Sequence, residues 1–359
     1  MKSQSILKYF PYFLFFYHLG FAWFAYDYVN QNNGDAVKYW FVGKNMEKLS
    51  WFQFLNPGTD AIKFICFPFV KYLHLPGWAG CLIFSALSGI GFLKLWKLLK
   101  EISGERRFLL ALSMILLLLP NAHFWTSLIG KEAFLFLPVV CIAEKIYRKE
   151  FWAWSLFLSF FIIAWIRPHV AFVFLLAYVI SIIWKGEFSV RIKAFLGILG
   201  IVLASGLYFL LSRITQAQTG LFEKIQRLYA AHNFKLKGTS GYVPLEDYVY
   251  PYKMFTFYFR PFPLERNGLY NQIIGVENLI WLIGFLLVSY GVVRWFKKIK
   301  WTVFLLFAVF FLLLYGTMYA YAYANFGMII RTRTLAFPCL LVFVINVLSL
   351  RAGSSSLRS

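Results

Sequence analysis

The distribution of charged residues between long apolar runs limits what this chain can fold into. Hydrophobic residues make up 60% of its 359 residues and charged residues only 14%. A soluble core cannot hide that much apolar surface, so the pattern predicts an all-α polytopic membrane protein. Because a membrane-spanning helix needs ~20 apolar residues, we expect about ten spans. These lie near 7–28, 77–96, 107–120, 132–146, 152–166, 170–184, 194–212, 277–294, 301–322 and 334–350.

Lysine and arginine cluster in every second loop between these spans. Lys94, Lys97 and Lys100 mark one such loop, and Arg294 and Lys300 mark another. The positive-inside rule places these loops and both termini in the cytoplasm, so we predict a multi-pass protein of the cytoplasmic (inner) membrane. The formal net charge of +21 then serves orientation and contact with anionic membrane lipids. Nucleic acid is a poor explanation for this charge, and we expect no nucleic-acid partner.

Two outer segments are too long to be simple turns. We expect residues 1–350 to form a single integral membrane domain, followed by a disordered cytoplasmic tail at 351–359. The first outer segment, 29–76, alternates apolar and charged residues, which predicts helices lying in the membrane interface. The second, 213–276, is a long outer loop before the eighth span, rich in tyrosine and phenylalanine. Such rings suit carbohydrate stacking, although interfacial aromatic belts also explain them.

Motifs for cofactor chemistry are missing from the sequence. There is no Gly-rich phosphate loop, no His/Cys metal cluster and no serine-nucleophile motif. The cysteines lie in apolar runs without paired spacing, which is typical of small buried hydrophobes. We therefore predict no cofactor, and nothing in the sequence supports a divalent metal. The cysteines are Cys66, Cys81, Cys141 and Cys339.

Asp35 is the candidate catalytic base on the outer face. It follows the first span by several residues and lies between Gly34 and Ala36. A carboxylate at the membrane surface can deprotonate an acceptor hydroxyl. The alternative is structural, since aspartate is also a preferred residue at the start of a helix.

Isolated outer cations mark two short connections between spans. Lys131, preceded by Trp125 in the same connection, stands at a predicted helix start, where a phosphate is favoured, although it also fits a lysine that snorkels to the interface. Arg167 lies in a very short turn before Pro168 and His169, and an arginine at this depth needs a partner or a cavity. Its guanidinium suits a phosphate oxygen.

The densest outer constellation precedes the eighth span. Arg260 offers another anion contact, and Glu265 orients it, carries acid–base chemistry, or forms an internal ion pair with it. Arg331 and Arg333 stand at the outer start of the last span, where residues two apart on a helix point in different directions. Several cations on one face predict a polyanionic partner, and a lipid phosphate fits because its tail stays in the bilayer.

At these residues the chain resembles the multi-spanning glycosyltransferases that use polyprenyl-phosphate sugars, the C-type glycosyltransferase superfamily. The resemblance rests on Gly34-Asp35-Ala36 outside the first span, the surface helices after it and about ten spans. It implies that Asp35 activates the acceptor and that outer cations hold the lipid phosphate. The acidic pair often found after the first span of that superfamily is a single aspartate here.

A second resemblance is to bacterial O-antigen and exopolysaccharide polymerases. It rests on Phe124-Trp125, Gly130-Lys131, Phe259-Arg260-Pro261 and the pair Arg331 and Arg333. These resemblances imply a transferase that moves a sugar from a polyprenyl-phosphate donor to a glycan or lipid acceptor in envelope polysaccharide assembly. The alternatives are a repeat-unit polymerase, a lipid-linked sugar transporter or flippase, and a non-catalytic membrane subunit. The predicted partners are polyprenyl-linked sugar or oligosaccharide and membrane lipids.

Overall fold

The computed structural model describes residues 2–32, 34–40, 49–214, 227, 230–231, 233–296 and 299–353. Within these ranges the chain is helical and forms no strand, which confirms the all-α prediction. Its contacts divide it into two compact units. Unit 1 comprises 1–171, 284–299 and 334–359, and unit 2 comprises 172–283 and 300–333.

The first half of the chain forms short surface helices between longer apolar ones. The elements are α1 (Lys2–Asn32), α2 (Asp35–Trp40), η2 (Trp51–Phe54), α3 (Thr59–Phe67), η3 (Pro68–Tyr72), α4 (Gly77–Ser103), α5 (Arg107–Leu117), α6 (Pro120–Ser127), α7 (Lys131–Tyr147), α8 (Trp154–Ile166) and α9 (Pro168–Lys185). The short helices α2 and α3 occupy the predicted interfacial segment, of which 41–48 lie outside the described residues.

The second half has the same alternation of long and short helices. The elements are α10 (Val190–Ile214), η4 (Leu245–Asp247), α12 (Tyr250–Phe259), α13 (Leu269–Trp295), α14 (Val303–Ala322), α15 (Phe326–Arg333) and α16 (Phe337–Gly353). The predicted outer loop 213–276 therefore contains α12 and the first turns of α13. Much of its first half, and the tail from 354 onward, lie outside the described residues.

Each of the ten predicted apolar segments lies within a helix, with differences of a few residues at some ends. Four helices are long and apolar enough to cross a membrane: α4, α9, α13 and α14. Two bent pairs, α5 with α6 (44°) and α15 with α16 (58°), raise the number to six if each pair is one span. The described part of the chain thus has four to six candidate spans, and the prediction of about ten is not confirmed.

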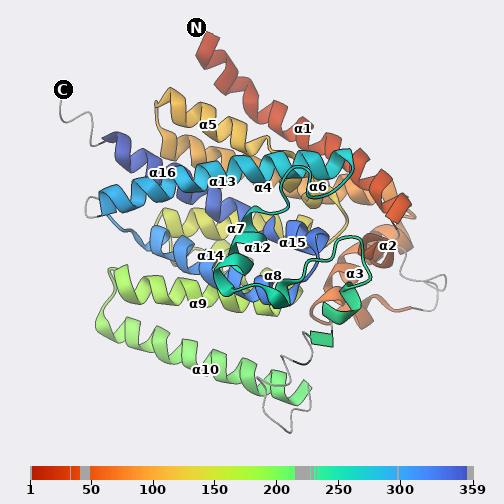
Figure 1. The fold of residues 1–359 in the computed structure, drawn as a ribbon. Coiled ribbons are helices and arrows are strands. Elements are labelled where there is room, and N and C mark those ends of the chain that lie inside the picture. Colours follow the sequence, from red (N-terminus) through yellow and green to blue (C-terminus); the bar gives the residue numbers. More distant parts are fainter. Residues whose placement is uncertain are drawn as a thin grey trace. The chain divides into compact units, whose positions relative to one another are not determined.

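Unit 1 packs around α4, which contacts α1, α5, α6, α7 and α16 (Figure 1). Glycines on α4 permit these close approaches, as small residues do between membrane helices. A Cβ at Gly80 would lie 2.6 Å from the Trp40 ring, and one at Gly91 would lie 2.8 Å from the Phe136 ring. The core of unit 1 therefore depends on backbone proximity at specific positions of one helix.

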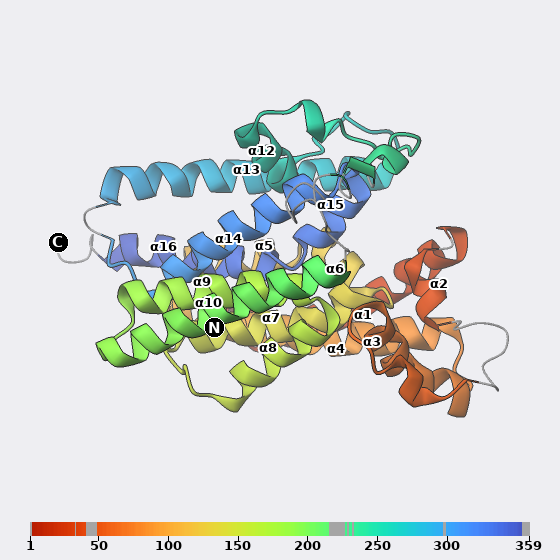
Figure 2. The ribbon, with the colours of Figure 1, turned by 90° about the horizontal axis from the view of Figure 1, so that it is seen from below.

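Unit 2 contains the hairpin of α9 and α10 and the pair α12 and α14 (Figure 2). Phe174 of α9 stacks on Phe311 of α14, with ring centroids 4.1 Å apart. Aromatic residues then follow α14 at intervals of four, from Phe307 through Phe311 and Tyr315 to Tyr319. This buried ladder leads from the apolar middle of α14 to the end of α12, where the polar residues of unit 2 gather.

Candidate functional site

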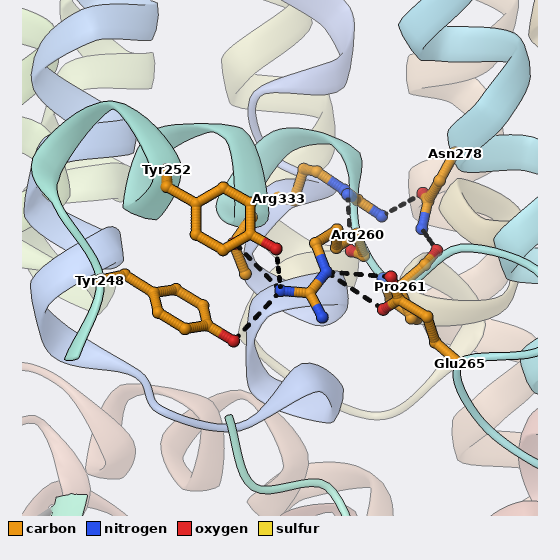
Figure 3. A network of polar contacts seen from close by, with 8 residues as sticks. Tyr248, Tyr252, Arg260, Pro261, Glu265, Asn278 and Arg333 are labelled. Carbon is orange, nitrogen blue, oxygen red and sulfur yellow. Dashed lines mark hydrogen bonds and ion pairs between the residues drawn. The ribbon is translucent and has the colours of Figure 1, made fainter. Parts of the chain in front are cut away.

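Arg260 lies at the C-terminal end of α12, inside a cage of polar side chains from unit 2 (Figure 3). Its Nε donates hydrogen bonds to both carboxylate oxygens of Glu265, at 3.0 and 3.1 Å. Its Nη1 donates to the hydroxyls of Tyr252 at 3.1 Å and Tyr248 at 3.3 Å. The exposed fraction is 15% for the Arg260 side chain and 24% for that of Glu265, so the pair is shielded but reachable.

One edge of the Arg260 guanidinium stays available. Nη2 makes no hydrogen bond to any residue that the structure describes, while Nε and Nη1 are both engaged (Figure 3). The faces of Tyr252 and Phe326 lie 5.5 Å from the guanidinium carbon, which is cation–π range. Burial opposes the charge, but hydrogen bonds with Tyr248 and Glu265 outweigh it and raise the pKa of Arg260. The cage thus fixes a permanent cation with one free N–H₂ group, a geometry that suits an oxyanion.

Arg333 clamps the helix end that carries Arg260. Its Nη1 donates to the carbonyl of Tyr258 at 2.6 Å and, at longer range, to those of Phe257 and Arg260. The last carbonyls of a helix have no partner within it and carry partial negative charge, so a guanidinium satisfies both requirements. Nη2 of Arg333 donates to Asn278 on α13, and Asn278 in turn donates to the carbonyl of Pro261 at 2.7 Å (Figure 3).

A glycine lets α13 reach the turn after α12. A Cβ at Gly275 would lie 2.6 Å from the carbonyl carbon of Phe262 and 2.8 Å from the Cα of Pro263. Real Cβ atoms do not make such contacts with backbone, so only glycine fits here. The turn that connects Arg260 to Glu265 is therefore held on one side by Arg333 and on the other by α13.

Arg167 is held in unit 1 by a buried ion pair. It caps α8, and its Nη2 donates to Glu132 in the first turn of α7. The exposed fractions of the two side chains are 6% and 1%. Arg167 therefore has the partner that an arginine at this depth needs, and the partner belongs to the protein.

The other predicted residues of unit 1 lie in varied surroundings. Lys131 at the start of α7 donates to the Thr59 hydroxyl of α3 at 3.3 Å. His169 is exposed in the first turn of α9. Trp125 is buried on α6 and packs edge-on against Phe124, with ring centroids 5.2 Å apart.

Asp35 is the first residue of α2, and its side chain is about half exposed (48%). Lys38, one turn later, places its Nζ 3.7 Å from the carboxylate. The backbone N–H of Val37 bonds to the carbonyl of Gly34, so the helix begins around the aspartate. A carboxylate in the first turn complements the helix dipole, which agrees with the structural reading, and its exposure leaves it accessible to an acceptor.

The structure brings Arg260, Glu265 and Arg333 into one network, while Arg331 lies half-buried two residues earlier on α15. Sequence reasoning missed three of the network's members: Tyr248, Tyr252 and Asn278. Tyrosines are so frequent in this chain that these two carry no signal of their own. Asn278 does carry a signal in the sequence, because an asparagine within an apolar run needs hydrogen-bond partners.

Comparisons with protein-family models, curated proteins and solved structures give no match to this chain.

Proposed function

We propose that this chain is a membrane glycosyltransferase that takes a sugar from a polyprenyl-phosphate carrier, and that Arg260 holds the carrier's phosphate. The observation that carries the proposal is the Nη2 group of Arg260, which makes no hydrogen bond to any described residue while Nε and Nη1 are both engaged. A phosphate oxygen accepts from such a group without disturbing the bonds that orient it. The apolar helices around it suit a substrate whose tail stays in lipid.

In this reaction the phosphate is the leaving group. A general base, a role for which the sequence proposes Asp35, accepts the proton of the acceptor hydroxyl, whose oxygen forms a bond to the anomeric carbon. The bond from that carbon to the phosphate oxygen breaks, and the phosphate departs with the electron pair. Arg260 stabilises the negative charge that develops there, and Glu265 keeps the guanidinium oriented. The proposal includes the topology predicted from charge: about ten spans in the cytoplasmic membrane, both termini inside and the active face outward.

Binding of the carrier tests the role of Arg260 directly. Full-length protein in nanodiscs is titrated with undecaprenyl phosphate, and binding is followed by native mass spectrometry. Arg260→Gln should weaken binding by about tenfold or more, since a charge-assisted hydrogen bond is lost. The matched control is Arg266→Gln, because the Arg266 side chain donates only to the carbonyl of Ser240 among the described residues. Equal binding by Arg260→Gln and wild type would overturn the assignment.

Transfer is tested separately from binding. Envelope glycan from cells expressing wild type, Asp35→Asn or Arg260→Gln at matched levels is analysed for composition and chain length. The proposal expects both variants to lose addition of one sugar. Shortened chains of intact repeat units, with no effect of Asp35→Asn, would identify a polymerase instead. Unchanged glycan in both variants would overturn the enzyme assignment in favour of transport or a structural subunit.

A further inference from the structure

Two histidines form a buried pair inside unit 1. His18 of α1 and His123 of α6 are fully buried, and their Nδ1 atoms are 2.9 Å apart. Sequence reasoning gave neither residue a role, because 105 positions separate them and no spacing pattern joins them. Ionisable groups within apolar helix bundles are costly, so a pair in this position calls for an explanation.

The two imidazoles belong to a row of four hydrogen-bond contacts. The Nε2 of His123 is 2.6 Å from the carbonyl oxygen of Leu117, and the Nε2 of His18 is 2.8 Å from the Ser88 hydroxyl. The nearest carbonyl oxygen to that hydroxyl is that of Thr126 at 2.7 Å, and those of Phe84 and Ser85 on the same helix lie at 3.0 and 3.1 Å. Both end groups are carbonyls near helix ends, where α5 and α6 stop, so they can only accept hydrogen bonds.

The number of available protons shows that this row of hydrogen-bond contacts can take up one more proton. Two neutral imidazoles and one hydroxyl supply three protons for four contacts. If all groups are neutral, one contact therefore joins two lone pairs at 2.6 to 2.9 Å. One added proton fills these four contacts: His123 donates to Leu117, the imidazoles share a proton, and His18 donates to Ser88, which donates to Thr126, its nearest carbonyl acceptor.

The surroundings of the pair supply aromatic faces and no counter-ion. Phe92 stacks on His123 at 4.1 Å and lies 4.7 Å from His18, and Tyr17 meets His123 edge-on at 4.9 Å. Among the described residues no charged side chain contacts either imidazole, and Tyr17 is the one other titratable group against them. Aromatic faces stabilise a buried cation, while burial itself opposes charge.

The backbone around His18 is fixed independently of the imidazoles. The carbonyl of His18 accepts a hydrogen bond from the Ser85 hydroxyl at 3.2 Å. A Cβ at Gly89 would lie 2.9 Å from the Phe15 ring and 3.2 Å from the His18 ring, so α1 and α4 meet at a glycine. The short contacts of the pair are thus imposed by the packing of three helices.

We propose that the His18–His123 pair is a proton-binding site, which takes up one proton from water and shares it between the two imidazoles. Uptake adds one proton and one positive charge, and breaks no covalent bond. The site is independent of the proposed transferase activity, since it uses none of that site's residues.

Nitrogen NMR of the full chain in nanodiscs tests this proposal. A His74→Gln/His169→Gln/His232→Gln background leaves only the pair to be observed among the five histidines. In the neutral state we expect the proton of His123 on Nε2 and that of His18 on Nδ1. On acidification one proton per chain should enter, and both rings should respond together. No uptake before unfolding, or two separate uptakes, would overturn the proposal.

Ser88→Ala separates the proposal from ordinary burial of two histidines. Without the hydroxyl, two contacts remain for two protons, so the neutral pair is already complete. Proton affinity should then fall by about tenfold or more, as expected for a lost hydrogen bond to a charged group. Ser85→Ala is the matched control, because the Ser85 hydroxyl bonds to the backbone of His18 and to Ser127 and makes no hydrogen bond to either imidazole among the described residues. Equal proton affinity in both serine variants would overturn the proposed network.

Discussion

Two arginine–glutamate pairs differ in what surrounds them. Arg167 and Glu132 of unit 1 are almost completely buried, whereas Arg260 and Glu265 of unit 2 remain partly exposed. The sequence predicts both arginines as phosphate ligands, because each is an isolated cation on the predicted outer face. Burial sets different requirements for the two pairs: a fully buried charge must be neutralised by the protein, while a partly exposed one can still contact a ligand.

The largest expected effect comes from breaking the buried pair. Arg167→Met removes the charged partner of the buried Glu132 carboxylate and should destabilise the protein by about 3–5 kcal/mol. The double variant Arg167→Met/Glu132→Leu should recover most of that loss, since it removes both charges. Denaturant unfolding in detergent measures both. A loss below ~1 kcal/mol in the single variant, typical of exposed pairs, would show that the two regions do not differ.

Substitution of Arg333 tests whether the partly exposed pair of Arg260 and Glu265 depends on the contacts that hold the end of α12. Arg333→Met removes a charge-assisted clamp on the end of α12 and should cost about 1.5–3 kcal/mol, together with weaker binding of undecaprenyl phosphate. Arg333→Lys keeps the charge but cannot reach Asn278 and the carbonyls at once, so it should rescue only in part. Full rescue by lysine would show that charge alone, and not the fork geometry, holds the site.

Gly275→Ala disturbs the same turn without touching a polar group. The new methyl group would collide with the backbone of Phe262 and Pro263, and overpacking of this kind costs about 1–3 kcal/mol. Gly284→Ala on the same helix is the matched control, because nothing lies within 4 Å of its Cβ position. Unfolding and phosphate binding are compared in both variants. We expect only Gly275→Ala to lower the two together.

The smallest effect concerns an exposed carboxylate in unit 2. The hydrogen bond from the Tyr242 hydroxyl lowers the pKa of Glu246. A lowered folded-state pKa contributes stability above the unfolded-state value and loses it as the pH falls through the folded value. The stability difference between wild type and Tyr242→Phe should therefore be small at neutral pH and vanish in acid. A difference that grows on acidification would contradict this sign.

The sequence predicts the helices well and their ends less well. Apolar runs locate every predicted segment within a helix, since that signal depends only on composition. The start of α13 is eight residues earlier than expected. Gln272 lies in the predicted outer loop 213–276, but in the structure its side chain bonds to the backbone of Leu264 and Arg266 in the turn before α13. Its polarity is satisfied by tertiary contacts that no local pattern shows.

The residues of the candidate site also differ in how far the sequence predicts them. Arg260 and Glu265 could be found because they are close in sequence, whereas Arg333 joins them only through folding. Helix α6 is not among the predicted helices, although Pro120 at its first position is a residue that favours helix starts. The pair of His18 and His123 had no such signal, because it depends on where α1, α4 and α6 meet.

The contacts that hold the end of α12 also determine which part of the site around Arg260 can be changed. Arg333, Asn278 and Gly275 fix the end of α12 from α15 and α13, so the backbone position of Arg260 is set by helices. Tyr248, by contrast, comes from the segment that precedes α12. Exchanging that segment would alter what surrounds the Arg260 guanidinium while leaving the backbone position of Arg260 unchanged. The helices thus hold the backbone of Arg260, while the segment before α12 can be varied separately.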